Sequence, residues 1–164
     1  MDEKKPLLSS TLVIRSAVAE DVDTLRDVFR RASLTTEGAQ AFFADHPEWL
    51  VWDDTMLPFA RVAVADGRVV GFASARPVED FLELEDLFTD PDWMRKGIAS
   101  SLLKDIVRRG MRVEVTAGPH AVAFYEFVGF VVSGIANTQG GPAPRMQLDA
   151  TCVRPFTDQG NNWI

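Results

Sequence analysis

Two cationic side chains and a glycine stand where an apolar, strand-like run gives way to an amphipathic helix in DPDWMRKGIASSLLKDI, residues 90–106. A helix N-terminus leaves backbone N–H groups unpaired and carries a partial positive charge. Gly97 and Ala99 leave those donors accessible, and Arg95 and Lys96 add positive charge nearby. The stretch therefore predicts an anion site suited to a diphosphate. A plain surface turn with two solvated cations is the alternative reading.

Two common phosphate-binding patterns are absent from the sequence. Neither G-x-x-x-x-G-K-[ST] nor G-x-G-x-x-G occurs. A generic α/β fold that binds another phosphate-bearing ligand stays open at this point.

Three carboxylates crowd the preceding strand-like run, DFLELEDLFT, residues 80–89. In a regular strand Glu83 and Glu85 would share one face with Leu87, and Asp86 would interrupt the apolar residues on the other. This phase slip predicts a β-bulge near residues 85–86, which would turn side chains toward a site. Neighbouring carboxylates repel, which raises the pKa of one and makes it a better base. A solvated acidic face explains the same residues.

Apolar periodicity and turn residues predict the elements that position these groups. The first half of the chain is expected to contain a strand over 11–17, a helix over 20–33, one or two short helices in 35–52 broken near Pro47, and a hairpin over 60–77 that turns at Asp66-Gly67. A strand over 80–89, a helix ending at Gly110 and a strand over 112–118 follow. The last elements are a helix over 119–129 with Pro119 in its first turn, and strands over 130–135 and 145–149 joined by a Gly- and Pro-rich loop.

This order predicts an α/β fold with a mixed sheet, in which the strand–helix–strand unit over 81–116 contains a parallel pair with a right-handed crossover. With 164 residues, one domain over 11–150 is expected, with an N-terminal tail over 1–10 and a C-terminal tail or docking segment over 151–164.

Composition bounds the partners and the compartment. The formal net charge of -7 argues against nucleic acid or an anionic membrane as the main partner. Cys152 is the single cysteine, so no intramolecular disulfide can form, and no catalytic role is expected for it. The start of the chain shows no secretory signal, and no apolar run approaches the roughly 20 residues that span a bilayer. We expect a cytoplasmic protein.

Two motifs together resemble the GNAT superfamily of acetyl-CoA-dependent N-acetyltransferases. Their pyrophosphate loop reads Q/R-x-x-G-x-G/A, which MRKGIA matches at Gly97 and Ala99. Their fourth helix commonly reads N-x-x-A-x-x-F-Y-E followed by G-F, which GPHAVAFYEFVGF, residues 118–130, matches from Ala121 onward. Met94 stands in place of the loop's first Gln or Arg, and Gly118 in place of the Asn, so two side-chain contacts to the cofactor are lost.

The resemblance implies about seven mostly antiparallel strands with a central parallel pair, four helices, and acetyl-CoA as acyl donor with no metal. It also implies direct transfer to an amine, either a small molecule or a protein amine, and leaves a homodimer open. The expected cofactor-binding residues are Leu87, Phe88, Thr89, Met94, Arg95, Lys96, Gly97, Ile98, Ala99, Ser100, Ala121 and Phe124.

The resemblance further implies that Tyr125 is the general acid for the thiolate, although a Tyr that simply packs with a polar tip is the alternative. A backbone N–H near Leu87 to Thr89 would hold the acyl oxygen. A carboxylate or a water chain would take the proton of the amine, with Glu83 favoured first and Glu85 and Asp86 close behind. His46 is a further candidate base, and His120 is expected near the cofactor or in solvent.

The acceptor cannot be identified from these motifs. Its determinants are expected in residues 35–60 and 137–145. Core or interface roles are favoured over substrate contact for Phe42, Phe43, Trp49 and Trp52, and the Asp53-Asp54 pair faces either a cationic acceptor or solvent. A longer acyl-CoA donor and a non-catalytic acyl-CoA-binding or regulatory module are the alternative functions.

Overall fold

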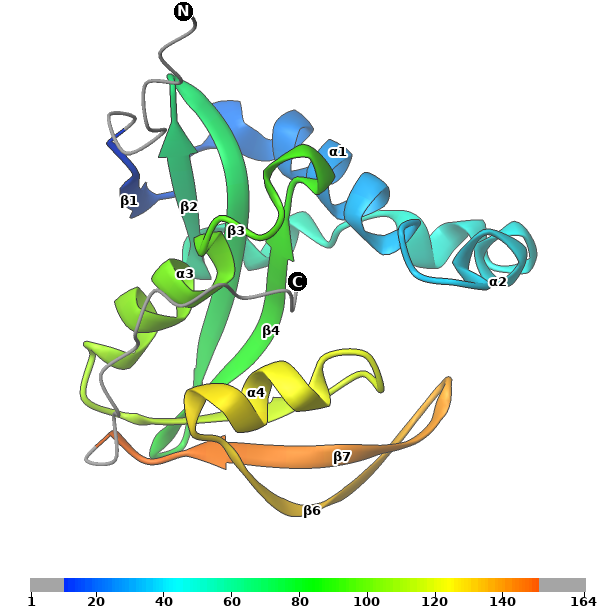
Figure 1. Ribbon diagram of the computed structural model, residues 1–164, viewed down its shortest axis with the longest axis vertical. Helices are drawn as coiled ribbons and strands as arrows, with labels where there is room; N and C mark the ends of the chain where they lie inside the picture. Colours follow the sequence, from blue (N-terminus) through cyan, green and yellow to red (C-terminus); the bar gives the residue numbers. More distant parts are fainter. Residues whose placement is uncertain (1–10, 151–164) are drawn as a thin grey trace, which may run out of the picture.

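A computed structural model describes residues 11–150, which form one seven-stranded sheet of order β1-β2-β3-β4-β5-β7-β6 with helices on both faces (Figure 1). The expected terminal segments and Cys152 lie outside the described residues. The strands are β1 Val13–Ser16, β2 Ala60–Ala65, β3 Arg68–Val78, β4 Phe81–Thr89, β5 Arg112–Thr116, β6 Val131–Thr138 and β7 Gly141–Leu148. The helices are α1 Val22–Ser33, α2 Ala39–Asp45, α3 Ile98–Val107 and α4 Val122–Val128, with four short 3-10 segments among the described residues.

The expected mixed sheet with one parallel pair is confirmed. β4 pairs with β5 in parallel, and the other neighbouring strands are antiparallel. The parallel pairing covers only residues 81–83 and 112–114, although β4 continues to Thr89 and β5 to Thr116. The two strands therefore diverge, and we call the gap between residues 84–89 of β4 and residues 115–116 of β5 the fork.

Two apolar clusters hold the layers together. One cluster joins α3 and α4 to one face of the sheet through Leu102, Leu103, Ile106, Phe124 and Val128, all nearly inaccessible to solvent. The other joins α1 to the opposite face through Leu25 and Val28, which meet Trp52 and Phe72. The helix that apolar periodicity predicts over residues 20–33 is thus confirmed, and its apolar stripe, which includes Leu25 and Val28, faces the sheet. In Figure 1, α2 projects beyond the edge of the sheet.

The hairpin between β2 and β3 turns where the sequence predicts. Asp66 and Gly67 both have positive φ, at 52° and 72°. Two successive left-handed residues define the turn that matches the natural twist of paired strands, which explains the Asp-Gly pair.

Two local expectations are wrong. Residues 137–144 are not a loop, because β6 and β7 pair along them from Val131↔Gln147 to Thr138↔Gly141. β7 lies between β5 and β6, and the carbonyl of Pro144 accepts a hydrogen bond from the N–H of Ala117 on the side away from β6. The nitrogen of a strand residue faces the same side as its carbonyl, so the nitrogens of Pro144 and of Pro142, two residues away, also face away from β6. Neither proline therefore removes a hydrogen bond from the β6–β7 ladder.

The start of α4 also differs from the prediction. Pro119 precedes the helix, which begins at Val122, because the N–H of Ala121 closes a turn onto the carbonyl of Gly118 at 2.9 Å. Pro119 then takes the second position of a β-turn, where its fixed φ is favoured.

None of the helices over residues 11–150 is long and apolar enough to cross a membrane.

Candidate functional site

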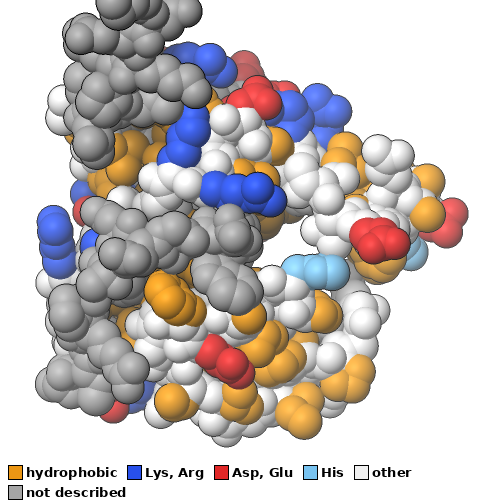
Figure 2. Space-filling view, in the orientation of Figure 1, with side chains coloured by type: hydrophobic (Ala, Val, Ile, Leu, Met, Phe, Trp, Pro, Cys, Tyr) orange, Lys and Arg blue, Asp and Glu red, His pale blue; other side chains and the backbone are white. Residues whose placement is uncertain are grey.

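A cavity of about 600 Å³ opens at the fork. The space-filling view shows a hollow between the upper and lower parts of the molecule with a histidine at its rim (Figure 2). Four regions of the chain build its wall: the end of α1 and the following turn, residues 84–89 of β4, the loop at Met94, and the segment from β5 into α4. The lining residues include Ser33, Thr35, Thr36, Glu37, Leu84, Glu85, Asp86, Leu87, Phe88, Thr89, Met94, Val115, Thr116, Gly118, His120, Ala121 and Tyr125.

The predicted bulge in β4 is present and determines which side chains reach the cavity. Asp86 pairs with Ser74 and Leu84 with Ala75, so Glu85 is one extra residue opposite β3. Before the bulge Leu84 packs in the α3 cluster, and after it Phe88 packs in the α1 cluster. Regular alternation would put both on one face, so the bulge reverses the phase of the strand.

The open edge of β4 turns backbone donors into the fork. The N–H of Asp90 donates to the carbonyl of Val70 at 2.8 Å, and the carbonyl of Phe88 lies beside Gly71, so both residues face β3. Peptide groups alternate along a strand, and those of Leu87 and Thr89 therefore face the fork. This places two N–H groups where the sequence predicts the acyl-oxygen contact.

Thr89 adds an unpaired hydroxyl to the same wall. Its side chain is buried, and its Oγ1 has no hydrogen-bond partner among residues 11–150. Buried polar atoms are normally paired, so a ligand group in the cavity would supply the missing bond.

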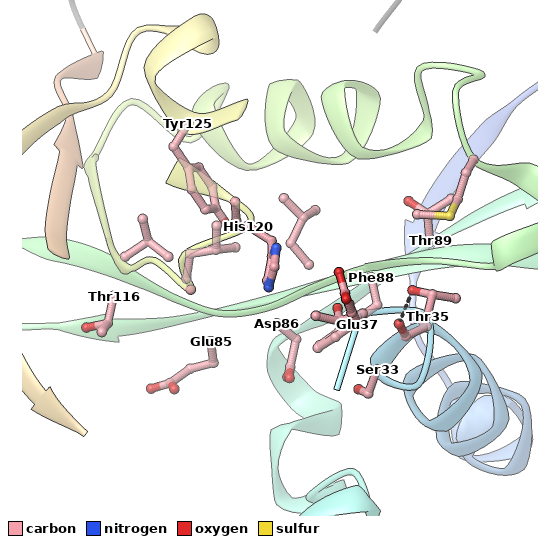
Figure 3. Close-up of a pocket in the computed structure, with 18 residues that line it drawn as sticks. Ser33, Thr35, Glu37, Glu85, Asp86, Phe88, Thr89, Thr116, His120 and Tyr125 are labelled. Atoms are coloured by element: carbon pink, nitrogen blue, oxygen red, sulfur yellow. Dashed lines mark hydrogen bonds between the residues drawn. The ribbon is translucent and has the colours of Figure 1, made fainter. Parts of the chain in front are cut away.

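Tyr125 enters the cavity from α4. Figure 3 shows it descending toward His120 from the side of β4 opposite Glu85 and Asp86. Its ring packs edge-on against Phe124 and Phe130, which fixes its direction. Burial raises the pKa of the Tyr125 phenol well above its ordinary value near 10, because the charged form loses its hydration. The side chain is therefore a neutral phenol at physiological pH.

Asp86 lies on the other side of β4, and one of its oxygens accepts two hydrogen bonds. Nε1 of Trp52 donates to Oδ2 at 2.9 Å, and Ser74 donates to the same oxygen. Burial raises the pKa of Asp86, while these two bonds lower it and the nearby charges of Glu85 and Asp53 raise it further. The carboxyl is thus held rigidly and binds a proton more readily than an exposed Asp.

The other two strand acids have different surroundings. Glu85 is exposed, lines the cavity and accepts a hydrogen bond from Arg76 at 3.1 Å. Glu83 is engaged by Arg145, which donates to it at 2.6 Å and also contacts Glu114. Glu83 is not among the lining residues, so the acid that the sequence favours first is turned away from the cavity.

The predicted anion loop begins at the cavity wall. Met94 lines the cavity, and Arg95 and Gly97 follow with φ of 65° and 77°. A Cβ at Gly97 would meet no atom of the described residues within 4 Å, so this part of the chain does not crowd the loop at that position. Lys96 lies over the ring of Trp93 at 4.6 Å. Ile98, Ala99 and Ser100 are buried, and any contact they make with an anion would come from the backbone.

An ion pair joins this loop to α1. Arg31 donates to both carboxylate oxygens of Asp90 at 3.0 and 2.7 Å, and Asp90 also accepts from the N–H of Asp92. The Arg31 guanidinium lowers the pKa of Asp90. The sequence analysis missed this pair because its members are 59 residues apart.

Several predicted residues lie elsewhere. Phe124 packs in the α3 cluster and Trp52 in the α1 cluster, while Phe42 is exposed on α2. His46 stacks on Trp49 with ring centres 3.9 Å apart, and neither lines the cavity. Ser33, Thr35, Thr36 and Glu37 line the cavity but were not named as site residues from the sequence. The signal present is their polar Ser-x-Thr-Thr-Glu pattern after a helix, which indicates an exposed turn.

No group of three His, Cys, Asp or Glu side chains over residues 11–150 is placed to hold a metal ion.

Comparison with known proteins extends these observations. The family model described as the acetyltransferase (GNAT) family matches residues 22–130. An uncharacterized N-acetyltransferase, YafP of Escherichia coli strain K12, is 36% identical over 69 residues. That match covers 42% of this chain and 43% of YafP, so less than half of the relative is spanned.

Solved structures share the fold at lower identity. The PaiA N-acetyltransferase of Thermoplasma acidophilum, in complex with coenzyme A, superposes with a TM-score of 0.64 and 20% identity, over 85% of this chain and 99% of that one. The ribosomal-protein-S18-alanine N-acetyltransferase of Escherichia coli gives 0.63 and 21%, over 90% and 99%. With the family match over most of the folded region, these findings show that the chain belongs to the acetyltransferase (GNAT) family.

Proposed function

We propose that this protein transfers an acetyl group from acetyl-CoA directly to the nitrogen of an amine at the fork between β4 and β5. The observation that carries the proposal is the single cavity into which the free edge of β4, Tyr125 and Asp86 all open. Each group suits one part of the transfer, and a family of acetyltransferases shares the fold.

The donor fits the residues on one side of the cavity. Backbone N–H groups at the first turn of α3, next to Arg95 and Lys96, suit the diphosphate. The pantetheine arm would then follow the open edge of β4, where the Thr89 hydroxyl has no partner among the described residues. The N–H groups of Leu87 and Thr89 would bind the acyl oxygen and stabilise the charge that develops on it.

The proton transfers are assigned to Asp86 and Tyr125. An alkyl ammonium has a pKa near 10 and must lose a proton before its nitrogen can attack. Asp86 takes that proton, directly or through water, and its rigid position and raised pKa suit the task. The nitrogen forms a bond to the acyl carbon, the C–S bond breaks, and the Tyr125 phenol protonates the departing sulfur. The second proton that the nitrogen must lose then returns through water to the Tyr125 phenolate. Glu85 is the second candidate base, since it lines the same cavity.

Two alternatives remain distinct from this proposal. A longer acyl-CoA could use the same groups, and a non-catalytic module could bind acyl-CoA without turnover. Met94 and Gly118 replace two side chains that the family commonly has. These replacements do not distinguish a transferase from a non-catalytic module, because the backbone N–H donors remain in both cases.

Release of free thiol tests the proposal. The protein is incubated with acetyl-CoA or hexanoyl-CoA and a panel of alkyl, aryl and peptide amines, and the acylated amine is identified by mass spectrometry. We expect amine-dependent thiol release with acetyl-CoA and a product heavier by one acetyl group. Tight binding of acetyl-CoA with no turnover on any amine would favour the module instead, and faster turnover with hexanoyl-CoA would favour the longer donor.

A further inference from the structure

A second cavity, of about 500 Å³, adjoins the first on the α1 face of the sheet. Glu85 and Asp86 line both cavities, so the bulge of β4 is the wall between them. The remaining wall comes from α1, the segment 51–59 and Arg76 of β3. Since the two cavities meet at the acids, a molecule in the second one would present its end to the fork.

Among residues 11–150, four charged groups line this cavity, and three of them are acids. Asp53, Glu85 and Asp86 face one cation of this part of the chain, Arg76, whose guanidinium already pairs with Glu85. Asp53 uses one oxygen, Oδ1, to accept from the N–H and hydroxyl of Thr55, at 3.0 and 2.7 Å. Its other oxygen has no partner among residues 11–150. The cavity therefore keeps a net negative charge that a cation would neutralise.

Between these acids the wall is apolar and partly aromatic. Phe29, Trp52, Met56 and Phe59 line it. Trp52 is fixed by its hydrogen bond to Asp86 and by edge-on packing against Phe72, with ring centres 5.3 Å apart. Such a surface suits an alkyl chain, and aromatic faces also attract cations.

We propose that this second cavity binds the acceptor, and that the acceptor is an alkyl diamine or a similar amine with a second positive charge at its far end. The reacting nitrogen lies at Asp86, the alkyl chain packs on Trp52 and Met56, and the distal ammonium lies at the free oxygen of Asp53. The inference rests on the proposed acetyl transfer and names its substrate class. The reacting ammonium loses two protons, one to Asp86 and one that restores the Tyr125 phenol after it has protonated the sulfur. The distal ammonium keeps its charge, and the product is a monoacetylated diamine.

Three amines of equal chain length test the distal charge. The substrates are 1,5-diaminopentane, pentylamine and 5-aminopentanoate, whose far groups are positive, neutral and negative. We expect kcat/KM for acetylation to be about two- to fivefold higher for the diamine than for pentylamine, and lowest for the amino acid, as one solvent-exposed charge contact provides.

Two neighbouring acids provide matched variants. Asp53→Asn keeps an oxygen that can accept from Thr55 but removes the charge, and it should reduce the preference for the diamine over pentylamine to near one. Asp54→Asn removes the same charge one residue away, from an acid that pairs with Arg26 at 2.8 Å and does not line the cavity. This control should retain the preference.

The outcomes separate the two proposals. Equal rates for the three amines, or a preference unaffected by Asp53→Asn, would overturn the diamine assignment while the transferase stands. No thiol release with these amines or with the wider panel would overturn the proposed function and this inference with it.

Discussion

Neighbouring side chains hold the Asp86 carboxyl in place and change its pKa. Trp52 and Ser74 both donate to Oδ2, which holds the group in one orientation on the bulge. The hydrogen bonds favour the ionised form, but burial opposes it and dominates. On the other side of the strand, burial also raises the pKa of Tyr125, so its phenol stays protonated. One strand thus separates two groups whose pKa values are both raised by burial, which suits the proton acceptor and the proton donor that we propose.

Replacing Tyr125 with Phe tests the donor. The hydroxyl has no hydrogen-bond partner among the described residues, so the variant should fold normally, with unchanged affinity for acetyl-CoA. We expect kcat to fall about 100-fold, the usual contribution of a positioned general acid. Steady-state kinetics measure kcat, and calorimetric titration measures cofactor binding. A variant with wild-type kcat would reduce Tyr125 to a packing residue.

Replacing Asp86 with Asn separates catalysis from stability. The amide oxygen can still accept from Trp52 and Ser74, but the group cannot take a proton, so kcat should fall about 100-fold or more. The folded-state pKa of Asp86 is raised, so its contribution to stability is complete below the unfolded value near 4 and is lost as pH rises through the folded value.

The stability of the Asn variant relative to wild type should therefore increase with pH. Urea unfolding at pH 4 and pH 8 measures the two free energies of unfolding. Asp90→Asn removes a carboxylate whose pKa is lowered by the Arg31 guanidinium, and it should show the opposite trend. A constant difference between pH 4 and pH 8 for Asp86→Asn would contradict the raised pKa.

At the scale of elements, the connection after β4 joins the parts of the site. Asp90 pairs with Arg31 of α1, caps the turn over Pro91–Trp93 and leads into the loop before α3. The end of α1 in turn continues into the residues 33–37 that line the first cavity. The anion loop and one cavity wall are therefore fixed to each other by one ion pair.

Asp90→Asn should lower the free energy of unfolding by about 2 kcal/mol at pH 7, because it leaves Arg31 facing an amide in a largely buried position. The folded-state pKa of Asp90 is lowered, so the pair stabilises fully above the unfolded value near 4 and is lost as pH falls through the folded value. The deficit should shrink in acid. Denaturant titrations measure this loss in the free energy of unfolding, and Asp92→Asn, at an exposed carboxylate, is the control. An equal loss for both variants would contradict a stabilising ion pair between Asp90 and Arg31.

The start of α3 provides a test of the diphosphate site. Gly97→Ala and Gly97→Glu carry the same strain at a φ of 77°, about 1 kcal/mol, but only Glu adds a negative charge. We expect Glu to abolish binding of coenzyme A and Ala to weaken it only slightly, as measured by calorimetric titration. Normal binding by the Glu variant would show that the diphosphate lies elsewhere.

At the scale of the whole molecule, local patterns predicted most of the fold. The Asp66-Gly67 hairpin, the stripe of α1 and the bulge at Glu85 each depend on neighbours in sequence, and all three are confirmed. The β6–β7 pairing was missed because two prolines suggest a loop, and only the identity of the neighbouring strands shows that the proline nitrogens face away from β6.

The site was predicted less completely, because its decisive contacts join distant segments. Trp52 meets Asp86 across 34 residues, and Arg145 meets Glu83 across 62. The contact with Trp52 holds Asp86 at the cavity, and the contact with Arg145 holds Glu83 away from it. Sequence spacing alone therefore could not rank Glu83, Glu85 and Asp86 as candidate bases. The net charge of -7 agrees with a cationic acceptor but does not identify it.

A crystal structure of the protein with coenzyme A tests the central claim most directly. We predict that the diphosphate contacts the backbone N–H groups at the first turn of α3 and that the sulfur lies in the fork, between Tyr125 and the edge of β4 at Leu87. Phosphates bound away from residues 95–100, or a sulfur outside the fork, would contradict the account.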